Sequence, residues 1–127
     1  MTEPRVTFLR GHESVNVAGE SHYQDALRAI SGQGEIRHDT EARLIPEPDN
    51  PHDANAVRVE IDGAKVGYLP RDLAPQWAPP LAELASRRRI GACEATVVGP
   101  ADGTLGVFLR LPDPTDARRI DDVARRL

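Results

Sequence analysis

Cysteine, lysine and aromatic side chains are scarce in this sequence of 127 residues. Cys93 is the only cysteine, so an internal disulfide is excluded. The residues around Cys93 are typical of a strand, and no histidine or lysine adjoins it to activate the thiol. We therefore predict a packed, unreactive thiol. Lys65 is the only lysine among 16 lysine and arginine residues, a bias typical of GC-rich bacterial genomes.

Long apolar runs and metal-binding spacings are also missing. Nowhere do about 18 apolar residues follow one another, and no basic start leads into an apolar segment. The four histidines and Cys93 show no paired spacing of the kind that zinc sites use. The sequence therefore predicts no membrane span, no metal, no cofactor and a cytoplasmic location.

Length and net charge limit the classes of function. A chain of 127 residues fits one domain and leaves no room for a helicase or ATPase motor. The net charge of -4 argues against strong, sequence-independent binding to duplex DNA, because that binding depends on neutralising many phosphates. A pocket for one strand end is compatible with this charge if local basic groups supply the attraction.

Apolar residues alternate with polar ones in several short runs, as they do in half-buried strands. We expect strands at residues 6–9, 14–17, 40–45, 56–61, 64–68, 92–98 and 105–111. Asp62-Gly63 predicts a tight hairpin turn, since both central residues of the favoured turn need positive φ. Short strands with two or three helices predict a mainly β fold of the α+β type. This fold is either a small OB-like β-barrel or a rolled antiparallel sheet.

The remaining periodic segments are expected to be helical. Apolar spacing predicts a helix at 22–30 and an amphipathic helix within 112–127. Asp72 is expected to cap a further helix, which its prolines should break into a turn and a second helix over 80–88. These prolines are Pro75, Pro79 and Pro80.

A polar turn at 47–53 separates two of the expected strands. Pro48 and Pro51 fix their own backbones and favour extended conformations in the residues before them. The turn should therefore present its polar side chains rigidly. The candidate binding residues are Asp49, Asn50, His52 and Asp53. Alternatively, these side chains only satisfy backbone groups of the turn, as Asn and Asp often do.

Three blocks carry a family resemblance. They are Val17-Ala18-Gly19-Glu20-Ser21-His22-Tyr23, then Glu47-Pro48-Asp49-Asn50-Pro51-His52-Asp53-Ala54-Asn55-Ala56-Val57, then Gly67-Tyr68-Leu69-Pro70-Arg71-Asp72-Leu73-Ala74. In this order they resemble the HIRAN domain, and the middle block is the specific one. We divide the chain into an N-terminal extension (1–13), a HIRAN-like domain (14–111) and a C-terminal helix (112–127). The resemblance implies an OB-like barrel that, in eukaryotic members, captures the 3′ end of single-stranded DNA.

The resemblance also implies roles for single residues. In HIRAN relatives the residues matching Asn50 and Asp53 contact the terminal 3′ hydroxyl, a group that an amide donor and an ionised carboxylate suit well. His52 stands where relatives have a tyrosine against the terminal nucleotide, so stacking should be weaker and more sensitive to pH.

Two further groups of residues match contacts in the family. Ser21, His22 and Tyr23 match a basic residue and two aromatic residues that contact phosphate and stack on bases, although Ser21 brings no cation. Tyr23 equally suits the core of its helix. Arg71 matches a lysine near the DNA backbone, and a guanidinium keeps that chemistry. Tyr68 joins the candidate DNA-binding residues, although its place in a hairpin strand also suits the barrel wall.

Surface ion pairing is the alternative for the arginines. For Arg71 the alternative is a surface arginine that pairs with Asp72 or Glu47. Arg87, Arg88 and Arg89 form the only run of three like charges, which we interpret as a solvated helix end, with a nucleic-acid contact as the alternative.

The sequence leads to one main hypothesis of function and two rivals. The main hypothesis is a non-enzymatic module that binds single-stranded DNA at a free 3′ end in DNA repair or replication-fork processing, with a helicase or nuclease as a partner. The second is a protein-interaction adaptor that keeps the fold without binding DNA. The third is a metal-dependent nuclease that uses Glu47, Asp49, Asp53 and Asp62. The oligomeric state is not indicated by the sequence.

Overall fold

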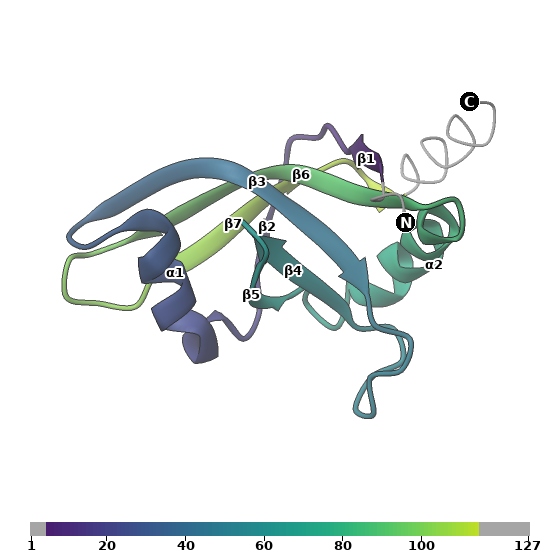
Figure 1. The fold of residues 1–127 in the computed structure, drawn as a ribbon, viewed down its shortest axis with the longest axis horizontal. Helices are drawn as coiled ribbons and strands as arrows, with labels where there is room; N and C mark the ends of the chain where they lie inside the picture. Colours follow the sequence, from purple (N-terminus) through teal and green to yellow (C-terminus); the bar gives the residue numbers. More distant parts are fainter. Residues whose placement is uncertain (1–4, 115–127) are drawn as a thin grey trace.

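The computed structural model describes residues 5–114, which form a rolled sheet with helices near its two ends (Figure 1). Its strands are β1 (Arg5–Phe8), β2 (Glu13–Asn16), β3 (Ile36–Pro46), β4 (Val57–Ile61), β5 (Ala64–Tyr68), β6 (Arg89–Gly99) and β7 (Gly106–Leu111). Its helices are the 3-10 helix η1 (Glu20–Tyr23), α1 (Gln24–Ser31) and α2 (Ala74–Ser86). All but the first three residues of the helix expected within 112–127 lie outside the described residues.

Two long strands, β3 and β6, form the centre of the sheet. The strand order is β2-β7-β6-β3-β4-β5, and β1 pairs in parallel with β6. The other strand pairs within residues 5–114 are antiparallel. At the two ends of this order an isolated bridge joins Ala18 to Tyr68 through N–H···O bonds of 2.8 and 2.9 Å. The sheet thus rolls onto itself without a closed ladder, which confirms the expected mainly β, OB-like rolled sheet.

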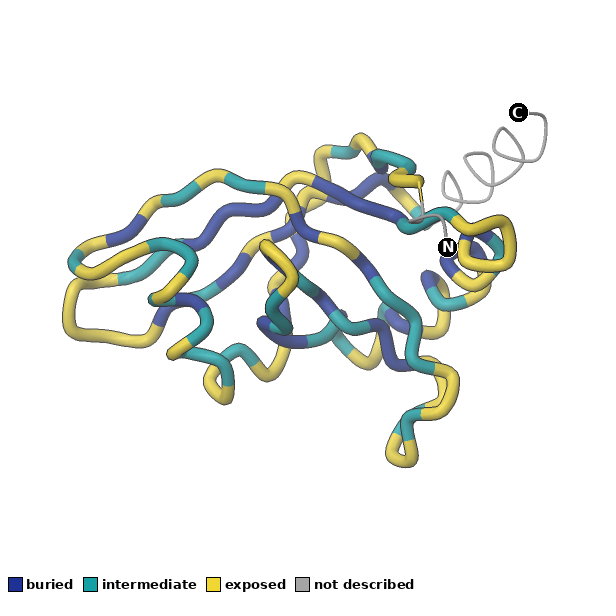
Figure 2. The backbone as a smooth tube through the Cα atoms, viewed as in Figure 1, coloured by how far each residue is buried: buried dark blue, intermediate teal, exposed yellow. Residues whose placement is uncertain are grey.

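The hydrophobic core lies inside this roll. In β4 the side chains of Val57, Val59 and Ile61 are buried, whereas Arg58 and Glu60 between them are partly exposed. This period of two follows from the pleat of a strand, which turns successive side chains to opposite faces. β7 alternates in the same way, whereas most of β6 is buried without alternation. Figure 2 shows many of the exposed residues in the loops. Within residues 5–114 no helix has the length and apolar character needed to cross a membrane.

The expected break in the helix after residue 72 is wrong, and so is the expected cap. α2 is one helix with Pro79 and Pro80 inside it, and its N-cap is Leu73, with no side-chain hydrogen bond and therefore no cap from Asp72. Each interior proline costs about 3 kcal/mol. Burying a large apolar side chain contributes about 1.5–3 kcal/mol, and α2 packs a whole apolar face against β6, β3 and β4. The buried residues of this face are Ala74, Trp77, Pro80, Leu81 and Leu84.

The predicted hairpin turn is confirmed, and other predicted elements are found with different ends. Asp62 and Gly63 have φ angles of 51° and 80°, as the expected hairpin turn requires. β3 and β6 begin earlier than expected, at Ile36 and Arg89, and the helix expected at 22–30 is divided between η1 and α1.

The packed thiol is confirmed. Cys93 is fully buried in β6, where burial together with the charges of Glu41 and Glu94 raises the pKa of the thiol to about 12. The thiol is therefore protonated at neutral pH and a poor nucleophile.

Gly67 allows the Ala18–Tyr68 bridge to form. Its φ is 150°, and a Cβ atom built there would lie 2.4 Å from Val17 Cγ1 and 2.5 Å from the carbonyl oxygen of Ala18. Any larger residue would push β5 away from the segment that follows β2. The close approach of these two segments forms one wall of the site described next.

Candidate nucleic-acid interface

The motif loop, residues 47–56, leaves the end of β3 and returns into β4, projecting from the body of the molecule (Figure 1). A backbone bond of 2.8 Å from the N–H of Glu47 to the carbonyl of Ala56 closes its base. Two further bonds of 3.0 Å, from Asn50 to Glu47 and from Ala56 to Asp53, form turns within it. The loop is therefore braced by its own backbone, as its prolines predict.

The side chain of Asn50 holds the loop together. Its Oδ1 accepts hydrogen bonds from the N–H groups of His52 at 2.9 Å and Asp53 at 3.2 Å, and its Nδ2 donates to Glu47 Oε1 at 3.0 Å. Asp53 Oδ1 likewise accepts from the N–H of Asn55 at 2.9 Å. These side chains therefore satisfy backbone groups of the turn, as the alternative interpretation predicts.

This bracing leaves one donor and one acceptor unused. A side-chain amide has two N–H donors, and within residues 5–114 only one of those of Asn50 is bonded. The second carboxylate oxygen of Asp53, Oδ2, also has no partner in that part of the chain. Asn50 and Asp53 line the same pocket, and an N–H donor together with a carboxylate acceptor suits a hydroxyl group, because a hydroxyl accepts one hydrogen bond and donates another.

A pocket of about 360 Å³ opens beside these groups, toward the small end of the range for ligand sites. Its walls come from three segments that are far apart in the sequence: the turn after β2, the motif loop and the end of β5. The lining residues are Ala18, Gly19, Asn50, His52, Asp53, Ala56, Tyr68, Leu69 and Arg71. The apolar lining with a few polar groups is typical of a binding site.

The structure brings together five of the nine candidate residues in this pocket. They are Asn50, His52, Asp53, Tyr68 and Arg71. The other four do not line it: Ser21 and His22 are exposed on η1, Tyr23 is half-buried, and Asp49 is exposed in the motif loop. Tyr23 lies close to the pocket nevertheless, because the ammonium of Lys65 lies over its ring and over that of Tyr68.

Arg71 is exposed and forms no ion pair within residues 5–114, so the expected alternative of pairing with Asp72 or Glu47 is wrong. Glu47 is already bonded to Arg58, whose Nη1 donates to Glu47 Oε2 at 3.0 Å and whose Nε donates to Glu60 Oε2 at 2.6 Å. The guanidinium at the edge of the pocket is therefore available to an anion.

Glu47 was not among the nine candidate DNA-binding residues, yet it connects the pocket to the sheet. Besides Asn50 and Arg58 it accepts a hydrogen bond from Tyr68 Oη at 3.0 Å. Burial acts to raise the pKa of Glu47, but hydrogen bonds from Asn50, Tyr68 and Arg58 and the charge of Lys65 outweigh it and lower the pKa. An ionised Glu47 thus holds two residues of the pocket in place.

Sequence reasoning missed other parts of the pocket as well. Ala18, Gly19, Ala56 and Leu69 line it, but their side chains carry no chemistry that a motif could reveal. All four lie within the three blocks that carry the family resemblance, and the positive φ of Gly19, 77°, turns the chain at the pocket wall. Within residues 5–114 no three His, Cys, Asp or Glu side chains are placed to hold a metal ion, so Glu47, Asp49, Asp53 and Asp62 do not form such a group.

The run of arginines lies elsewhere. Arg87 pairs with Glu83 at 3.3 Å, and Arg89 Nη1 donates to Thr7 Oγ1 at 3.3 Å. None of the three lines the pocket. Arg87 is the C-cap residue of α2 and Arg88 follows it, which agrees with the interpretation as a solvated helix end, whereas Arg89 begins β6.

Comparison with known proteins places this chain in a family. The family model described as "HIRAN domain" matches residues 11–111. The chain is similar to the crystal structure of the HIRAN domain of human HLTF, at 21% identity and a TM-score of 0.50, covering 93% of this chain and 89% of that one. It is also similar to the NMR structure of that domain, at 20% identity and a TM-score of 0.41, covering 90% and 87%. No curated protein matches the sequence. Since the family model spans most of its length, the chain belongs to the HIRAN domain family.

Proposed function

We propose that this chain is a non-enzymatic module that binds single-stranded DNA by its free 3′ end. HIRAN domains are DNA-binding modules, which supports a nucleic acid as the partner. The observation that carries the proposal is that Asn50, with an unused N–H, and Asp53, with an unused Oδ2, line one pocket that is too small for a duplex. A terminal 3′ hydroxyl satisfies both groups at once.

The rest of the pocket suits a terminal nucleotide. The exposed imidazole of His52 offers a flat face to a base or sugar, and the unpaired guanidinium of Arg71 offers two parallel donors to a phosphate. Binding through one end needs few phosphate contacts, which agrees with the net charge of -4. Free 3′ ends arise in DNA repair and at stalled replication forks, so we propose these settings, with a helicase or nuclease as the partner protein.

The test is fluorescence anisotropy with 5′-labelled oligonucleotides that differ only at the 3′ end. A 3′ phosphate removes the hydroxyl donor and places negative charge against Asp53, so it should bind worse than a 3′ hydroxyl. A hydrogen bond to a charged acceptor is worth about 1.5–3 kcal/mol, so Asp53→Ala should weaken binding of the 3′ hydroxyl strand roughly ten- to hundredfold.

The matched control is Asp102→Ala. Asp102 is exposed in the turn between β6 and β7 and does not line the pocket, but its removal makes the same change in charge. It should leave affinity unchanged. If 3′ hydroxyl and 3′ phosphate strands bind the folded wild-type protein equally, end capture is excluded and the adaptor hypothesis replaces it.

A further inference from the structure

Lys65, the only lysine of the chain, has an ammonium group that is not paired with a carboxylate. Within residues 5–114 it forms no ion pair. Its Nζ donates a hydrogen bond to Tyr68 Oη and lies 4.3 Å from the centroid of the Tyr68 ring and 5.5 Å from that of Tyr23. Aromatic rings attract a cation through their negative faces but do not neutralise it. The positive charge of Lys65 therefore stays available to attract an anionic group.

The carboxylates near Lys65 are bonded to another cation. Glu47 and Glu60 both accept hydrogen bonds from Arg58, whereas Lys65 makes no direct contact with Glu47 and acts on it through its charge and through Tyr68, whose Oη accepts from Lys65 and donates to Glu47. The hydrogen bond to Tyr68 raises the pKa of Lys65 against the opposing effect of burial, so the group remains an ammonium. An ammonium has three N–H donors, and hydrogen bonds to Tyr68 and Tyr23 use two of them, so one donor remains for a further acceptor.

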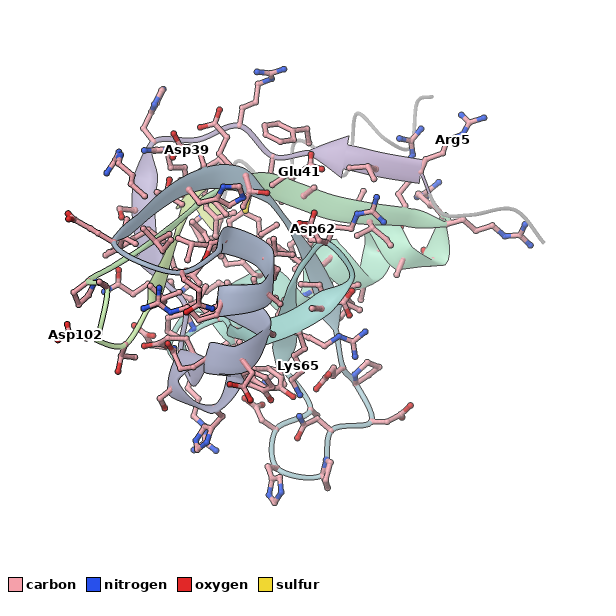
Figure 3. All side chains as sticks on the ribbon, turned by 60° about the vertical axis from the view of Figure 1, so that its left-hand side comes forward. Arg5, Asp39, Glu41, Asp62, Lys65 and Asp102 are labelled. Carbon is pink, nitrogen blue, oxygen red and sulfur yellow. The ribbon has the colours of Figure 1, made fainter. Side chains whose placement is uncertain are left out.

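Lys65 is placed directly next to the proposed end-binding pocket. Tyr68, over whose ring the Lys65 ammonium lies, is itself part of the pocket wall. Figure 3 shows Lys65 between the helical segment η1–α1 and the motif loop. A strand whose 3′ end lies between Asn50 and Asp53 and that leaves the pocket past Tyr68 meets this ammonium.

We propose that Lys65 contacts a backbone phosphate of the bound strand close to its 3′-terminal nucleotide, while Tyr23 and Tyr68 hold the ammonium in position. This inference rests on the proposed function. It assigns a binding role to a residue that no sequence pattern indicates, and it gives Tyr23 and Tyr68 the role of supports for a cation as well as any stacking on bases.

The test measures binding of a 5′-labelled strand with a 3′ hydroxyl at several salt concentrations. Lys65→Gln should weaken affinity about three- to tenfold and make the slope of log affinity against log salt shallower by about 0.7, the value for one phosphate contact on a single strand. Lys65→Arg keeps a cation and should restore most of the affinity. The matched control is Arg37→Gln, because Arg37 is exposed, forms no ion pair within residues 5–114, and lies at the start of β3 outside this pocket.

A second set of strands identifies the phosphate. In these strands one linkage near the 3′ end at a time is an uncharged methylphosphonate. One such linkage should weaken binding to the wild-type protein, and on that strand Lys65→Gln should have no further effect. Retained far-UV circular dichroism and thermal midpoint show that each variant is folded.

The outcomes separate this inference from the function on which it rests. If the wild-type protein discriminates 3′ hydroxyl from 3′ phosphate but folded Lys65→Gln binds no worse than Arg37→Gln, the role of Lys65 is excluded and end capture stands. If affinity falls equally on every methylphosphonate strand, Lys65 acts as a diffuse charge and the contact is likewise excluded. Absence of end discrimination removes both proposals.

Discussion

Ala18 and Tyr68 exchange two backbone hydrogen bonds of 2.8 and 2.9 Å although fifty residues separate them in the sequence. This bridge joins the two ends of the rolled sheet and places the turn at Gly19 opposite the end of β5. The pocket wall depends on it. The bridge in turn depends on Gly67, where the backbones approach too closely for a side chain.

Gly67→Ala should therefore destabilise the fold by about 2–4 kcal/mol, because the added methyl overlaps both Val17 and a backbone oxygen at a φ of 150°. Urea denaturation followed by circular dichroism measures the change. The matched control is Gly106→Ala in β7, where a Cβ meets nothing within 4 Å and the expected change is within about 0.5 kcal/mol. Equal stability of the two variants would show that the close approach at Gly67 is not required.

Glu47→Gln should change how stability depends on pH. Hydrogen bonds lower the pKa of Glu47 in the folded state below its unfolded value of about 4.3, so its contribution to stability is complete above that value. That contribution is lost as the pH falls through the folded pKa. The free energy of unfolding of the wild-type protein should exceed that of Glu47→Gln by about 1–3 kcal/mol at pH 7.

This difference should shrink below about pH 4, as the wild-type carboxylate takes up its proton. Urea denaturation between pH 2.5 and pH 7 measures this change, because that range includes the unfolded carboxyl pKa of about 4.3. The control is Glu35→Gln, since Glu35 is exposed and without a hydrogen bond or ion pair within residues 5–114. A difference that stays constant with pH would show that the charge of Glu47 does not matter.

His52→Tyr should tighten binding of single-stranded DNA. His52 is exposed at the pocket, and within residues 5–114 its side chain makes no hydrogen bond, so a larger ring there disrupts nothing. Base stacking on an aromatic ring is worth about 1–3 kcal/mol, and even a gain of about 1 kcal/mol corresponds to roughly fivefold in affinity. Anisotropy titrations should rank the proteins as His52→Tyr, wild type and His52→Ala from tight to weak. Any other order removes stacking from the role of residue 52.

Arg71→Glu should weaken binding to all sequences alike, roughly tenfold or more, and flatten the dependence on salt, because a phosphate contact carries no base information. Titrations with homopolymeric strands of each base check it. Arg88→Glu makes the same change in charge at the end of α2, outside the pocket, and should have a much smaller effect. Equal effects of the two variants would mean that only the overall charge of the chain matters.

The sequence predicted those parts of the fold that local patterns determine. The alternation of Val57, Val59 and Ile61 located a strand, and Asp62-Gly63 located its turn, because both depend on neighbours in the chain. The single helix α2 could not be predicted, because the cost of Pro79 and Pro80 is local whereas the packing that offsets it comes from strands far away in the sequence.

The same distinction applies to the site. The motif loop was recognised from its residues, and Asn50 and Asp53 do lie together at the pocket. The connecting role of Glu47 and the position of Lys65 over two rings depend on how β4, β5 and η1 come together, which no spacing along the chain reveals. That Asn50 braces the loop and still keeps one N–H free could be seen only from the hydrogen bonds.

The pocket is built from segments around residues 18, 50 and 70, so none of it exists until contacts of high sequence separation have formed. Opening of the Ala18–Tyr68 bridge would remove the wall that Ala18 and Gly19 form, whereas the hairpin of β4 and β5 has its own ladder. Under the proposed function, a strand end is a ligand of the fully folded state, so by mass action it should stabilise the whole domain. DNA binding and closure of the rolled sheet should then shift the same folding equilibrium.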